Sequence, residues 1–262
     1  MQFLLYVVIV VMLVKIFMMN KRTKKSKQLI SVVNSINDAD EFFQNVESFE
    51  ETMSDDAEFL NKGKVIHLWG MAYHKVIDGF EDELDSIDLH QLMKQGKKDA
   101  WTITEDEDSF FYMYLAIPNI LDKNGMITYR KKLNEKMNTV NEELSDQLCK
   151  NIGNALNLYY ESLDDKGLSF YEKVLNGDYG DYTYSKQLIG LYKSICAAQA
   201  AKLYKDNHQN DKYEECVPLL ENFSTSGLGE RWLQSLGLEI KKEEEKENEE
   251  TFDVSDESED KE

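Results

Sequence analysis

Proline, cysteine and positive charge are all scarce in this sequence. Two prolines in 262 residues leave long stretches without a helix breaker, and with abundant Leu, Glu and Lys this predicts an all-α fold. The three cysteines, Cys149, Cys196 and Cys216, cannot all pair with one another and show no CxxC spacing. Free thiols in a reducing compartment are the simplest interpretation. Because the net charge is −20 and a phosphate-binding surface needs clustered Lys and Arg, we expect no nucleic-acid partner.

Motifs that dictate a reaction are also missing. The sequence contains no HExxH, GxSxG or GxxxxGK[ST]. His67 and His74 are seven positions apart, whereas zinc chelation on one helix uses an i, i+4 pair with a third ligand close by. The turn at Gly125 lacks the ligand spacing of an EF-hand. We therefore predict no catalytic residue, no cofactor and no metal site.

One long apolar run lies near the start of the sequence, and from Phe3 to Met19 only Lys15 is charged. A helix of this length reaches roughly 25 Å, slightly short of a hydrocarbon core of about 30 Å. It predicts a transmembrane anchor at residues 1–20, whose apolar residues include Phe3, Leu4, Leu5, Val14 and Phe17. A cleaved signal peptide and a buried core helix are the alternatives. A signal peptide is disfavoured because no basic residue precedes the run and no Ala-x-Ala-like site follows it.

A basic segment at residues 21–27 follows the apolar run directly. Its charges are Lys21, Arg22, Lys24, Lys25 and Lys27. Since flanks rich in Lys and Arg stay on the cytoplasmic side, we expect a single-pass protein of the cell membrane. The amino terminus would lie outside and the bulk of the chain in the cytoplasm. Besides setting the topology, the segment suits an anionic inner leaflet.

Residues 28–238 are predicted to form one α-helical domain. Asp38 and Asp40 suit the start of a helix, and a stronger helical pattern begins at Lys64 and stops at Asp78-Gly79. Residues 97–109 have the composition of an acidic surface loop. The segment 109–133 leaves two interpretations open, a strand hairpin through the turn at Lys123 to Gly125 or two helices joined by it. The helical period that begins at Ile127 favours helices.

The last segment, residues 239–262, contains thirteen acidic and four basic residues. Such a tract cannot bury enough apolar surface to offset its ordering entropy, so we expect it to be disordered. It would act as a solvating tail, or as a charged lure for a basic partner.

Three segments of the domain resemble the tetratricopeptide repeat, in which paired helices stack into a solenoid. Small residues in that repeat let two helices approach, and aromatic residues fill the space toward the next pair. The matching positions are Gly70 and Tyr73 in the first segment, Tyr159, Gly167 and Tyr171 in the second, and Ala201, Tyr204, Tyr213 and Cys216 in the third. The spacing departs from a steady repeat of about 34 residues, and Glu83 stands where the first segment should have a small residue. The resemblance implies a stack of α-hairpins.

An anchor, stacked hairpins and missing catalytic motifs together predict a membrane-tethered scaffold that binds another protein in the cytoplasm. Its contacts would be the lipid bilayer and a protein whose identity the sequence does not reveal, as it does not reveal the oligomeric state. Two alternatives stay open. One is an enzyme, or a domain regulating one, with a dispersed site near residues 101–121, and the other is a structural membrane protein that associates with itself.

Overall fold

The protein is all-α in the computed structural model over the residues that it describes. These are 2–96, 109–140, 147–161, 164–180 and 186–239, with the side chains of 2–17, 93–96 and 164–166 left outside the description. The predicted acidic loop at 97–109 and the predicted tail at 239–262 fall outside these ranges except for their residues 109 and 239.

Thirteen α-helices and one π-helical segment are described. They are α1 (Gln2–Asn34), α2 (Ala39–Thr52), α3 (Ala57–His74), α4 (Phe80–Ser86), α5 (Leu89–Gly96), α6 (Ser109–Phe111), η1 (Tyr112–Ala116), α7 (Ile117–Lys123), α8 (Ile127–Asn138), α9 (Gln147–Tyr160), α10 (Asp164–Leu175), α11 (Lys186–Asp206), α12 (Asn210–Ser224) and α13 (Gly227–Ser235). No strand occurs in the described ranges, so the helical interpretation of segment 109–133 is confirmed.

Residues 109–123 form one buried helical run made of α6, η1 and α7. Its middle winds as a π-helix, in which the backbone N–H of Ile117 donates to the carbonyl of Tyr112 five residues earlier. Pro118 follows at once and has no N–H to give. The side chains from Phe110 to Asn119 are all buried, which makes this run the centre of the core.

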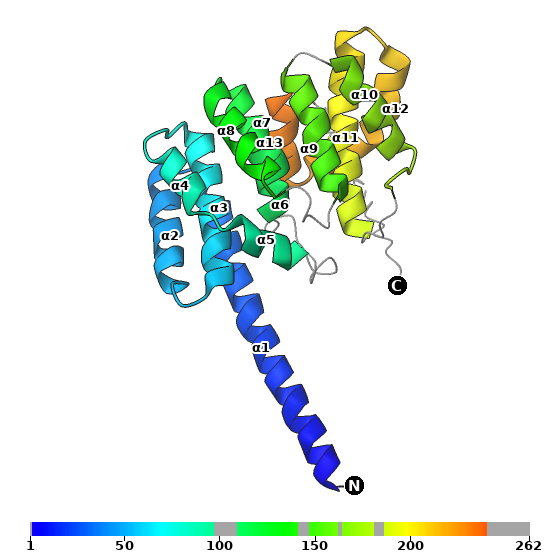
Figure 1. The fold of residues 1–262 in the computed structure, drawn as a ribbon. Coiled ribbons are helices and arrows are strands. Elements are labelled where there is room, and N and C mark those ends of the chain that lie inside the picture. Colours follow the sequence, from blue (N-terminus) through cyan, green and yellow to red (C-terminus); the bar gives the residue numbers. More distant parts are fainter. Residues whose placement is uncertain (1, 97–108, 141–146, 162–163, 181–185, 240–262) are drawn as a thin grey trace, which may run out of the picture.

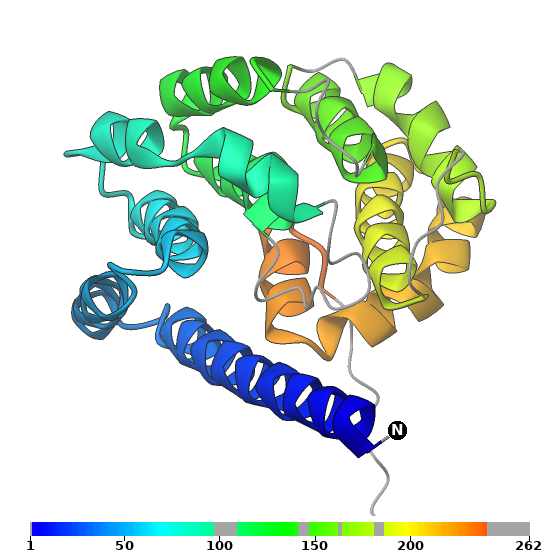
Figure 2. The ribbon, with the colours of Figure 1, turned by 60° about the horizontal axis from the view of Figure 1, so that its bottom comes forward.

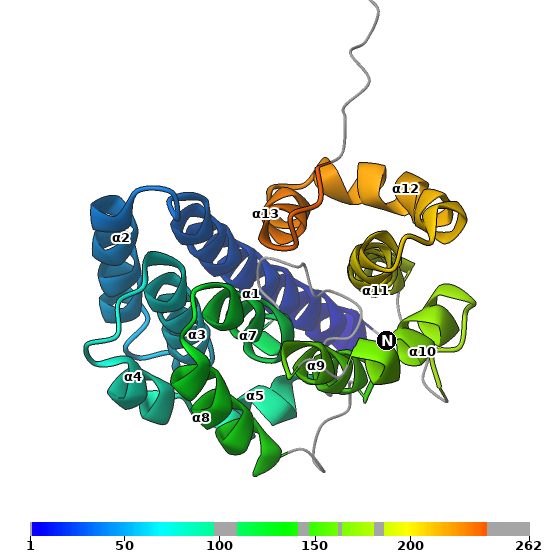
Figure 3. The ribbon, with the colours of Figure 1, turned by 90° about the horizontal axis from the view of Figure 1, so that it is seen from above.

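The helices pack around this run as a curved array. Helices α2, α3 and α4 lie side by side at one end, and α9, α10, α11 and α12 each pack against the next at the other (Figure 1). Helix α13 then returns to contact α7, so it lies inside the curve (Figure 2). Seen from above, α7 and α9 separate the α2–α4 group from α11, α12 and α13 (Figure 3).

Helix α1 joins this body only by its last part, and its first half extends away from the other helices (Figure 1). Leu29, Val32 and Val33 are buried against the body, and Asp38 caps α2 by accepting from the N–H of Glu41 at 3.0 Å. Within the described part of the chain, no helix is long and apolar enough to cross a membrane. The predicted anchor at residues 1–20, whose side chains up to Phe17 lie outside that part, gains no support from the fold.

The basic segment at 21–27 divides its charges between the body and solvent. Arg22 forms an ion pair with Glu58 at 2.9 Å, and Lys25 pairs with Asp56. Both partners lie at the start of α3, where Asp56 also accepts from the backbone N–H of Phe59. The remaining three charges of the segment are exposed, on Lys21, Lys24 and Lys27.

Candidate functional site

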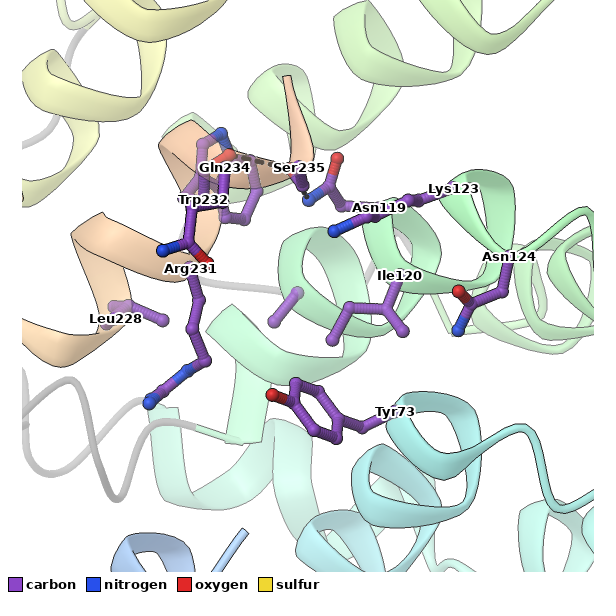
Figure 4. A pocket seen from close by; sticks show the side chains of 11 residues that line it. Tyr73, Asn119, Ile120, Lys123, Asn124, Leu228, Arg231, Trp232, Gln234 and Ser235 are labelled. Carbon is purple, nitrogen blue, oxygen red and sulfur yellow. Dashed lines mark hydrogen bonds between the residues drawn. The ribbon is translucent and has the colours of Figure 1, made fainter. Parts of the chain in front are cut away.

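A pocket of about 300 Å³ opens where α3, α7 and α13 meet. Side chains from all three helices converge on it, among them Tyr73, Ile120 and Arg231 (Figure 4). Its full lining is Tyr73, Ala116, Asn119, Ile120, Lys123, Asn124, Leu228, Arg231, Trp232, Gln234 and Ser235. The pocket therefore joins residues that are up to 162 positions apart in the chain.

A tight turn after α12 directs α13 toward the pocket. Ser226 caps α13 by accepting from the N–H of Gly229 at 2.9 Å. A Cβ at Gly229 would lie 1.9 Å from the carbonyl oxygen of Phe223, so the turn has no room for a side chain there. Trp232 is then buried beside the central helical run, with its ring 6.2 Å from that of Phe111. The wall that α13 contributes is thus fixed by packing at both ends.

Amide side chains connect the walls. The Asn119 amide nitrogen donates to the Ser235 hydroxyl at 2.8 Å, which links α7 to α13. The Asn124 amide nitrogen donates to the Ala72 carbonyl at 2.9 Å, which links the end of α7 to the end of α3. Each contact holds a buried or half-buried polar group in place, so the pocket is pre-formed rather than assembled by a ligand.

Two cations face this pocket without a carboxylate partner. Neither Lys123 nor Arg231 has a carboxylate within ion-pair distance in the described ranges, and the lining contains no acid. The Arg231 guanidinium instead lies over the Trp69 ring, 5.8 Å from its centroid. This concentration of positive charge is unusual in a chain of net charge −20. An apolar floor with cations and amides around it suits an anionic group carried on an apolar or peptide body.

The first repeat-like segment is packed differently from the sequence expectation. A Cβ at Gly70 would lie 1.9 Å from Cε1 of Phe42, so the close approach at this glycine is to α2, the preceding helix. In the tetratricopeptide pattern, by contrast, the small residue of the first helix approaches the second helix of the pair, which here would follow the turn at Gly79-Phe80. Tyr73 is half-buried and lines the pocket, where its hydroxyl donates to the Asn37 side chain at 3.4 Å.

The second and third segments lie in α9–α10 and α11–α12. A Cβ at Gly167 would lie 3.1 Å from the Ala155 carbonyl, which brings α10 close to α9. Ala201 is fully buried, and Tyr204 reaches across to α10, where its hydroxyl donates to Glu172 at 2.8 Å. The other predicted packing residues are the buried Tyr171 and Cys216 and the half-buried Tyr159 and Tyr213.

The cysteines offer no reactive thiol near the pocket. Cys149, Cys196 and Cys216 are all free and buried. Burial raises the pKa of the Cys196 thiol far above its usual range and that of Cys216 to about 11. Because the thiolate is the nucleophile and the metal ligand, such thiols are inert at neutral pH.

Sequence reasoning missed the pocket's main residues. Arg231 and Lys123 lie more than a hundred positions apart, and no local pattern indicates that α13 folds back on α7. The predicted alternative site at residues 101–121 overlaps the pocket only through Ala116, Asn119 and Ile120, and its residues 101–108 lie outside the described ranges.

Among known protein families, curated proteins and solved structures, none matches this chain. Its function is therefore inferred from the chemistry of its own residues.

Proposed function

We propose that this protein is a membrane-tethered scaffold that binds another protein through the pocket between α3, α7 and α13. The partner would present an acidic side chain or a terminal carboxylate to Arg231 and Lys123. The proposal rests on one observation. Lys123 and Arg231 line a pocket of an otherwise acidic chain, and neither has a carboxylate partner in the described ranges. Because the rest of the acidic surface repels anions, an anionic group of the partner would bind selectively at this pocket.

The lining favours binding over reaction. General acid–base chemistry needs a group whose pKa lies near the working pH, and the lining offers neither a carboxyl nor an imidazole. It offers amides from Asn124 and Gln234, which suit the backbone of a peptide, and an apolar floor of Ile120 and Leu228. No observation favours the enzyme or self-association alternatives over this one.

The tether belongs to the proposal because of the sequence at residues 3–19 and the continuity of α1. The helix runs from Gln2 to Asn34 without a break, so an inserted first half would be rigidly continuous with the part that packs on the body. The basic segment would keep the body in the cytoplasm, with the amino terminus outside. Arg22 and Lys25, bound to Glu58 and Asp56, would hold the body close to the headgroups.

We also propose that α9–α10 and α11–α12 are stacked hairpins of the tetratricopeptide kind. Support comes from small residues at their close approaches, Gly167 and Ala201, and from the successive packing of α9 to α12. In this proposal the array is the frame that brings α13 back to the pocket.

Partner capture by charge-reversed variants tests the function. The full chain, reconstituted into lipid nanodiscs, would be crosslinked to proteins from its native cells as wild type and as Lys123→Glu/Arg231→Glu. Lys123 is exposed and Arg231 is partly exposed, so the double variant should fold, and circular dichroism checks that it does. We expect a reproducible partner that the double variant loses. Lys205→Glu, a single charge reversal at an exposed site on α11, should retain it. Equal capture by all three proteins would contradict the proposal.

A further inference from the structure

Three side chains that commonly ligate metals meet outside the pocket, between α2, α3 and α4. They are Glu50 near the end of α2, His67 in the middle of α3 and Glu83 on α4. One ligand atom from each, the imidazole nitrogen and one oxygen from each carboxylate, lies within 4.8 Å of the other two. These three helices pack side by side (Figure 1).

Two of the three distances between these atoms are close to those between ligands of one small cation. The Nδ1 atom of His67 lies 3.4 Å from Oε1 of Glu50 and 3.7 Å from Oε1 of Glu83. Metal–ligand distances of about 2.0–2.2 Å place tetrahedral zinc ligands roughly 3.3–3.6 Å apart. The His67 nitrogen thus lies at about the required distance from each carboxylate, and the two carboxylate oxygens lie within 4.8 Å of each other.

The same three atoms are buried and make no hydrogen bond of good geometry, so their contacts are the ion pairs that a protonated His67 forms with Glu50 and Glu83. Buried polar atoms are normally hydrogen-bonded, because desolvation without a partner costs about 1–3 kcal/mol each. The cluster contains an imidazole nitrogen as well as two carboxylate oxygens, and a bound cation would satisfy all three atoms. The side chains are still about one-fifth exposed, at 20%, 21% and 19%, which leaves room for water as a fourth ligand.

We propose that Glu50, His67 and Glu83 form a binding site for a divalent transition-metal ion, with Zn²⁺ the best fit. One imidazole nitrogen and two carboxylate oxygens suit Zn²⁺ or Mn²⁺ better than Ca²⁺, which takes oxygen ligands alone. A bound ion would fasten α2, α3 and α4 together, and the site is independent of partner binding at the pocket.

The surrounding charges perturb the pKa values of this cluster. Burial lowers the pKa of His67, but Glu50, Glu83 and the more distant Glu47 outweigh it, so the pKa is raised. Burial raises the pKa of Glu83, which His67 and Lys64 oppose.

Titration of the full chain in detergent, without a histidine tag and stripped by a chelator, tests the site. Calorimetry with Zn²⁺ should show one saturable site per chain. Tetrahedral Co²⁺ should give its visible absorption without the charge-transfer band that thiolate ligands add. Glu83→Gln should weaken binding by about tenfold or more, as should Glu50→Gln and His67→Gln, while circular dichroism of the metal-free variants checks that they fold.

Glu51→Gln is the matched control, since Glu51 is exposed on α2 beside Glu50. It should bind zinc as the wild type does. Absence of a saturable site, or equal weakening by Glu51→Gln and Glu83→Gln, would overturn the proposal, because it would show diffuse binding to an acidic surface.

Discussion

Single residues decide where helices approach most closely in this protein. Gly70 lies over the ring of Phe42, which is itself fully buried. Gly229 lies on a backbone carbonyl at the turn that leads into α13. At both positions the absence of a side chain allows a close approach that places α3 or α13, and these two helices supply two walls of the pocket.

Gly70→Ala should therefore destabilise the protein even though alanine favours helices. A Cβ 1.9 Å from Phe42 forces the ring or α2 to shift, and such overpacking typically costs about 1–3 kcal/mol. Gly190→Ala is the control, because Gly190 is also helical but a Cβ there meets nothing within 4 Å. It should be neutral or stabilising by about 0.5–1 kcal/mol. Thermal unfolding of the full chain measures both, and equal midpoints would show that α2 and α3 do not meet as described.

At this scale the repeat resemblance singled out Gly70 as a position of close helix approach, and in the structure the helix that approaches it is α2. A glycine in a helical pattern indicates that something comes close, yet the pattern does not say which helix. The cluster of Glu50, His67 and Glu83 was missed because its members come from three helices, whereas the search along one helix compared only His67 with His74.

At the scale of elements, the start of α3 is also the joint to α1. Burial alone would raise the pKa of Asp56, but Lys25 and the N–H of Phe59 outweigh it and hold the pKa below its usual 3.8. A lowered folded-state pKa means that Asp56 stabilises the fold above the unfolded pKa, and that this stability is lost as the pH falls through the folded value.

Asp56→Ala should lower stability at neutral pH by about 1 kcal/mol through the lost cap, and by more through the lost ion pair. Asp56→Asn keeps a capping oxygen and loses only the charge. Its difference from the wild type should be present at pH 7 and vanish well below pH 3.8. Asp55→Asn, at the exposed neighbouring position, should match the wild type throughout. Unfolding midpoints across this pH range measure the effect, and a difference independent of pH would refute it.

The packing of α11 against α12 leads to a second prediction. Ala201 is fully buried, so Ala201→Leu should overpack the interface and cost about 1–3 kcal/mol. Cys216→Ala exchanges one small residue for another and should change the melting temperature little. Lys205→Leu, at an exposed position one turn on, is the control. If Ala201→Leu were as harmless as Lys205→Leu, the stacked-hairpin proposal would lose its best support.

Helices were the most predictable elements, because apolar periodicity and capping residues such as Asp38 are local. Their irregularities were not. The predicted helix at Lys64 begins seven residues earlier, at Ala57, and the π-helical turn at Tyr112–Ala116 has no local sequence pattern that we recognised. The start at Ala57 follows the local cap by Asp56, which the apolar pattern alone does not reveal. The π-helical turn lies in the buried core, where packing decides how the helix winds.

At the scale of the whole molecule, the return of α13 to α7 creates the pocket, and no pattern within either helix predicts it.

The membrane tether rests on the sequence, and its topology is testable. A reporter that fluoresces only in the cytoplasm, fused after residue 262, should fluoresce. Replacing the five basic residues at 21–27 with Gln should scramble the orientation without abolishing insertion. A signal from a reporter that is active only outside the cytoplasm, fused at the same position, would refute the orientation.

The central claim is that a partner is held in the pocket at the membrane, and crosslinking in living cells tests it most directly. A photo-crosslinking amino acid at Leu228 lines the pocket, and one at Glu214 is exposed on α12 outside it. We predict a discrete crosslinked product in the membrane fraction from position 228, absent from position 214 and lost when Arg231→Glu is added. No discrete product from position 228, or the same product from both positions, would contradict the account.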